Sequence, residues 1–133
     1  MSNSKFTFHT SLIIDDNEID VLVNRRLITL TDFSENVIIS STAEEALDFL
    51  RRECTSSKHA PDWIFLDIHL PGMDGFEFIE EFKKLPDFVK DKTRIVVLSA
   101  FQKQERLENA LKQLQAKYGD SSVRLASALE KEN

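Results

Sequence analysis

Acidic and hydroxyl side chains follow three short apolar runs, at the points where those runs end. The runs and their polar ends are residues 12–14 with Asp15 and Asp16, residues 63–66 with Asp67, and residues 95–98 with Ser99. Aspartates gathered in one pocket repel each other, so such a group must take up a proton or bind a cation. Oxygen ligands suit a hard cation such as Mg²⁺, which keeps several of its waters. These residue types predict a divalent-cation site if the fold joins the three ends.

The elements that would position these residues alternate along the chain. Short apolar runs lie at residues 12–14, 37–39, 63–66 and 95–98, and apolar residues at helical spacing follow each run, in residues 19–30, 43–50, 78–85 and 107–118. Thr42 and Glu45 form a capping-box pattern before the second stripe. Strands that are apolar throughout and alternate with helices indicate a doubly wound, parallel α/β sheet. In such sheets the functional site lies just beyond the carboxyl ends of the strands.

A simpler interpretation exists for each aspartate alone. An Asp after a strand is commonly a turn residue or a helix N-cap, and Asp15 or Asp16 could cap the helix that starts near Glu18. The occurrence of acidic or hydroxyl residues at three strand ends favours a shared site.

The segments at these strand ends resemble a known family. Residues 14–17 (Ile-Asp-Asp-Asn), 66–75 (Leu-Asp-Ile-His-Leu-Pro-Gly-Met-Asp-Gly) and 96–100 (Val-Val-Leu-Ser-Ala) are similar to the receiver domain of two-component response regulators, the CheY-like superfamily. The resemblance covers residues 12–119 and implies one receiver domain over residues 1–133. It also implies a flavodoxin-like fold with strand order 2-1-3-4-5.

The resemblance assigns roles in phosphoryl transfer and metal binding. Asp67 would be the phosphoacceptor, and it would bind Mg²⁺ together with Asp16. Asp15 would hold the ion through water, and the backbone carbonyl of His69 would complete the protein ligands. Ser99 would be the switch hydroxyl that turns toward the phosphoryl group, and the small Ala100 would leave room for it.

The expected activity is signalling by phosphorylation, not catalysis on an external substrate. A histidine kinase or a phosphotransfer protein would donate the phosphoryl group, and a downstream protein partner would sense the change. The formal net charge of −6 argues against direct nucleic acid binding. No apolar run approaches 18 residues, so no membrane span is expected, and the single cysteine, Cys54, excludes an internal disulfide. The expected location is cytoplasmic.

The C-terminal residues depart from the family pattern. The family carries a lysine, usually followed by proline, at the end of its fifth strand, whereas residues 119–126 contain neither. Arg124 is a possible stand-in for that lysine. Asp120 or Ser121 could instead cap a short helix, which leaves the fifth strand undefined and the last helix short or missing. Residues 120–133 are therefore diverged or truncated relative to the family.

Two alternatives follow from these observations. Because the lysine is missing, the chain could be a degenerate receiver that acts as a phosphorylation-independent interaction module. A phosphatase with an aspartyl-phosphate intermediate would need a second Asp two residues after its nucleophile, but His69 stands there. The phosphoacceptor hypothesis is the one that accounts for the whole set of strand-end residues.

Overall fold

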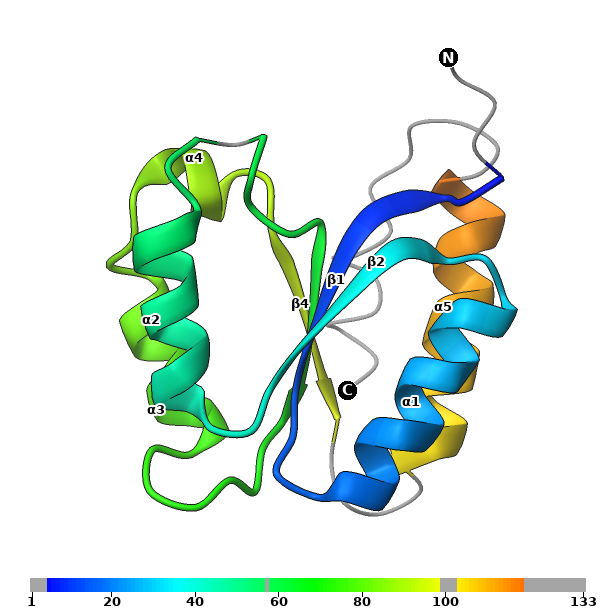
Figure 1. The fold of residues 1–133 in the computed structure, drawn as a ribbon, viewed down its shortest axis with the longest axis horizontal. Helices are drawn as coiled ribbons and strands as arrows, with labels where there is room; N and C mark the ends of the chain where they lie inside the picture. Colours follow the sequence, from blue (N-terminus) through cyan, green and yellow to red (C-terminus); the bar gives the residue numbers. More distant parts are fainter. Residues whose placement is uncertain (1–4, 57, 99–102, 119–133) are drawn as a thin grey trace.

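A parallel sheet with helices on both faces forms the fold (Figure 1). The computed structural model describes residues 5–56, 58–98 and 103–118. Its elements are β1 (Phe8–Ile14), α1 (Glu18–Leu30), β2 (Ser34–Ser40), α2 (Ala43–Glu53), β3 (Trp63–Asp67), α3 (Gly75–Phe82), α4 (Asp87–Lys90), β4 (Arg94–Leu98) and α5 (Lys103–Tyr118). The strand order β2-β1-β3-β4 confirms the doubly wound, flavodoxin-like prediction. Residues 119–126, considered for a fifth strand, lie outside the described residues.

Two apolar cores lie on opposite faces of the sheet. Along β3, Ile64 and Leu66 pack with α2 and α3, whereas Trp63 and Phe65 pack with α1 and α5. All four side chains are at most 1% exposed. Because successive side chains of a strand point to opposite faces, a strand that is apolar throughout must be covered on both sides. This packing fixes the strand ends relative to one another.

The sequence predicts a buried stripe on α1 made of Ile19, Leu22, Val23, Leu27 and Leu30, and the structure buries only part of it. Helix α1 forms as predicted, but Ile19, Leu22 and Leu30 are 71%, 65% and 68% exposed. The residues that α1 buries are Asn24 and Ile28, and Ile28 belongs to the core shared with α5, against which Leu27 also packs. Both sets follow helical spacing, so periodicity alone could not decide which one faces the sheet.

Helix α2 begins where the sequence predicted, whereas α3 is shorter than predicted. Helix α2 begins after Thr42, whose Oγ1 accepts a 3.0 Å hydrogen bond from the N–H of Glu45, as the sequence predicted. Helix α3 ends at Phe82, so the predicted stripe through Leu85 was too long. Leu85 is nevertheless buried in the turn that leads to the short α4, which the sequence did not predict.

Helix α5 covers the same face of the sheet as α1 (Figure 1). Its buried side chains, Leu107, Ala110, Leu111 and Leu114, match the predicted stripe. In the described part of the chain, no helix is long and apolar enough to cross a membrane.

Candidate functional site

The carboxyl ends of β1 and β3 carry a cluster of aspartates. Ile14 pairs with Leu66 in the parallel register, so Asp15 and Asp67 follow at the same edge of the sheet. One carboxylate oxygen from each of Asp15, Asp16 and Asp67 lies within 4.8 Å of the others. Asp15 and Asp67 are buried, at 3% and 5% exposure, whereas Asp16 is exposed. The fold thus joins the three aspartates that the sequence singled out.

Backbone donors orient the two buried carboxylates. The N–H of Asn17 donates to Oδ1 of Asp15 at 2.9 Å, and the N–H of His69 donates to Oδ1 of Asp67 at 3.1 Å. Asn17 itself caps α1, because its side-chain oxygen accepts a 2.9 Å bond from the N–H of Asp20. The alternative in which Asp15 or Asp16 caps this helix is therefore wrong.

The donor set of the cluster fits a hard divalent cation. It consists of three carboxylates with no sulfur or imidazole ligand atom in the group. At such separations like charges repel strongly, and more so where burial lowers the effective dielectric constant. A cation such as Mg²⁺ would remove this repulsion, and oxygen ligands on a partly exposed edge leave space for its waters.

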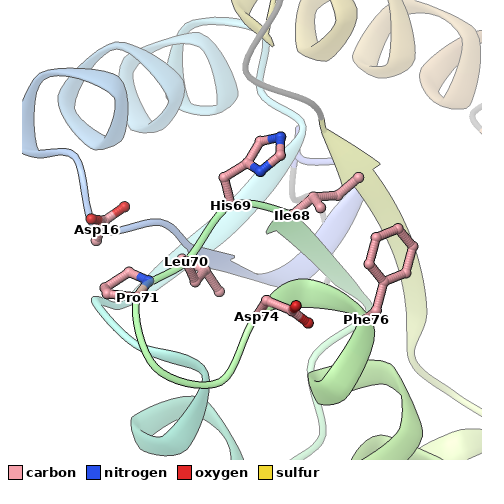
Figure 2. A pocket seen from close by; sticks show the side chains of 7 residues that line it. All are labelled: Asp16, Ile68, His69, Leu70, Pro71, Asp74 and Phe76. Atoms are coloured by element: carbon pink, nitrogen blue, oxygen red, sulfur yellow. The ribbon is translucent and has the colours of Figure 1, made fainter.

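An open hollow of about 570 Å³ adjoins the cluster. Figure 2 shows its walls, with Asp16 on the segment after β1 and the other lining residues on the loop after β3 and the first turn of α3. Those residues are Ile68, His69, Leu70, Pro71, Asp74 and Phe76. The His69 side chain is exposed, and Phe76 is 63% exposed although it is aromatic. The acidic edge is therefore accessible from solvent through this hollow.

Three predicted site residues, Ser99, Ala100 and Arg124, lie outside the described residues. The described end of β4 does reach Asp67. Leu98 pairs with Asp67 in the register, and its carbonyl accepts a 3.3 Å bond from the N–H of Ile68.

Sequence reasoning missed two residues near the site. Asn17 was read only as part of the Asp-Asp-Asn segment, yet it caps α1 and orients Asp15 through its N–H. Glu44 was not singled out, but its Oε2 accepts a 3.3 Å bond from the N–H of Met73 in the segment after β3. An acidic residue in the first turn of a helix is common, so the sequence carried no signal for that contact.

Fold and site together define an α/β domain with an acidic cluster at the carboxyl edge of its parallel sheet. Residues 11–118 match the family described as the response regulator receiver domain, and the chain belongs to that family. Receiver domains are signalling domains of two-component systems.

Similar proteins agree with this assignment. The chain is 32% identical over 77 residues to the two-component response regulator ARR19 of Arabidopsis thaliana. This match covers 58% of this chain and 18% of that protein. It is 30% identical over 89 residues to the sensory/regulatory protein RpfC of Xanthomonas campestris, covering 67% of this chain and 11% of that protein. The chain thus spans less than a fifth of these relatives. A two-component response regulator from Cytophaga hutchinsonii shares the fold, with a TM-score of 0.70 and 24% sequence identity. The structural match covers 85% of this chain and 98% of that one.

Proposed function

We propose that this chain accepts a phosphoryl group on Asp67 from a histidine kinase or a phosphotransfer protein and thereby changes its binding to a downstream protein. The observation that supports this proposal best is the cluster itself. A buried Asp67 at the end of a central strand has two further carboxylates within 4.8 Å, beside a hollow that opens to solvent.

Asp67 would act as the nucleophile. One carboxylate oxygen attacks phosphorus, so an O–P bond forms while the P–N bond of the donor phosphohistidine breaks. The electron pair leaves with the donor imidazole, which takes up a proton. The N–H of His69, 3.1 Å from Oδ1 of Asp67, holds the carboxylate in one orientation, which lowers the entropy lost on reaching the reactive geometry.

Mg²⁺ is the cofactor that the donor set fits. Asp16 and Asp67 would hold it directly, Asp15 through water, and the carbonyl of His69 would complete the protein ligands. When bound, the ion neutralises the charge that keeps a carboxylate from an anionic phosphoryl group. The roles predicted for Ser99 as switch hydroxyl, for Ala100 and for Arg124 stay predictions.

The test is the intact mass of the chain after incubation with Mg²⁺ and a small phosphodonor, acetyl phosphate. We expect one phosphoryl adduct that needs Mg²⁺ and is absent in Asp67→Asn. A second arm offers a phosphorylated histidine phosphotransfer protein as donor. If neither donor produces an adduct, the proposal is wrong, and a module that binds partners without phosphorylation becomes the better description.

A further inference from the structure

The loop between β3 and α3, residues 68–74, is held at both of its ends by hydrogen bonds within the loop and the first turn of α3. The carbonyl of Ile68 accepts bonds from the N–H groups of Leu70 at 3.2 Å and of Gly75 at 2.9 Å. At the far end, Asp74 and Glu77 form a reciprocal capping box at the start of α3. These bonds leave the tip of the loop, Gly72 and Met73, to be held from elsewhere.

A carboxylate from a separate helix contacts this tip. Glu44, in the first turn of α2, accepts the N–H of Met73 through Oε2 at 3.3 Å, across 29 positions in the sequence. Gly72 has a φ of +72°, and a Cβ placed on it would lie 3.2 Å from the same Oε2. A glycine at this position therefore serves two needs, because it adopts the left-handed backbone and leaves room for the carboxylate.

We propose that Glu44 is a positioning residue for phosphoryl transfer, and this inference rests on the proposed function of Asp67. The Glu44 contact fixes the tip of the loop against α2, and the loop carries His69 and Pro71 along the wall of the hollow. Holding that wall in place keeps the His69 N–H on Asp67. The same loop position would let the His69 carbonyl serve as a ligand to a bound cation. The entropy of ordering the loop is then lost on folding and not during the reaction.

The test compares Glu44→Ala and Glu44→Gln with Asp48→Ala. The glutamine variant keeps a side-chain oxygen that can accept from Met73, and Asp48 is an exposed carboxylate one turn further along α2. Three quantities are measured. They are the exchange rate of the Met73 amide hydrogen, the affinity for Mn²⁺ by calorimetry, with Mn²⁺ as the probe for divalent-cation binding, and the rate of phosphorylation by acetyl phosphate at saturating Mg²⁺.

We expect Glu44→Ala to speed Met73 exchange and to lower Mn²⁺ affinity and phosphorylation rate by about two- to tenfold each, the effect of one lost hydrogen bond. Glu44→Gln should recover most of each loss, and Asp48→Ala should match the wild type. Wild-type affinity and rate in Glu44→Ala would overturn the inference while the proposed function stands. If the wild type forms no adduct, the proposed function fails, and unchanged Mn²⁺ affinity in Glu44→Ala would then reject the role of Glu44 as well.

Discussion

Asp15, Asp16 and Asp67 share one cluster but differ in their surroundings. Asp15 and Asp67 are buried and accept backbone N–H bonds, whereas Asp16 is exposed beside the hollow. The buried pair is fixed in place by the sheet and its loops. Asp16 can therefore lose its charge with little effect on packing, which makes it the cleanest position for testing metal binding.

At the residue scale, we expect Asp16→Asn to weaken Mn²⁺ binding by at least about tenfold. The change removes one full charge from a cluster whose oxygens lie within 4.8 Å, and a tenfold change in affinity corresponds to about 1.4 kcal/mol. Calorimetric titration would measure the affinity, and Asp48→Asn serves as a control for net charge. Equal affinities in the two variants would show that Asp16 is not a ligand.

At the scale of elements, the apolar residues of α1 differ widely in burial. Ile28 is fully buried against the core shared with α5, whereas Leu22 is 65% exposed. We expect Ile28→Ala to lower the free energy of unfolding by about 2–5 kcal/mol. Leu22→Ala should change it by less than about 0.5 kcal/mol. Urea unfolding followed by circular dichroism would measure both, and similar losses would contradict this placement of α1.

The start of α3 lies directly against the backbone of Asp67 and Ile68. A Cβ on Gly75 would lie 2.8 Å from Cα of Ile68 and 3.1 Å from the carbonyl oxygen of Asp67. Neither atom can move without shifting β3 or its loop, so we expect Gly75→Ala to destabilise the fold by about 1–3 kcal/mol.

Thermal unfolding would measure the effect of Gly75→Ala, with Phe76→Ala as a neighbouring control on an exposed side chain. The Gly75 variant should also lose phosphorylation rate, because the clash displaces the Asp67 backbone. A Gly75→Ala variant with wild-type stability and phosphorylation rate would mean that α3 can move away from residues 68–74 without effect on either quantity.

At the scale of the whole molecule, a cation that binds the acidic cluster would also stabilise the fold. A ligand that binds only the folded state stabilises it, by about 1.4 kcal/mol at ten times its Kd. We therefore expect saturating Mg²⁺ to raise the Tm by about 4–6 °C. Without Mg²⁺, Asp67→Asn should melt above the wild type, because it relieves like-charge repulsion.

Differential scanning calorimetry at constant ionic strength would separate this linkage from general salt effects. The Asp67→Asn variant should gain much less from Mg²⁺ than the wild type does. An equal rise in Tm for both proteins would place the bound cation away from this cluster.

The sequence by itself determined the order of the four strands and the main helices and the three aspartates of the site, but not the short α4. Short apolar runs such as residues 63–66, alternating with helical stripes, favoured strands covered on both faces and hence a parallel sheet with helices on either side. In a parallel sheet, residues that follow neighbouring strands meet at one edge. The grouping of Asp15 and Asp16 with Asp67 was therefore predictable before any coordinates were known.

Only the tertiary structure decided which residues of α1 are buried and that Asn17, not an aspartate, caps this helix. The same is true of the contact between Glu44 and the tip of the loop of residues 68–74. Capping residues recur at Asp15, Asp16 and Asn17, and only the backbone geometry shows that the local bond runs from Asp20 to Asn17. Packing between elements that lie far apart in the chain decided the burial of α1 and the Glu44 contact. Glu44 and Met73 are 29 positions apart, and no short-range pattern records that distance.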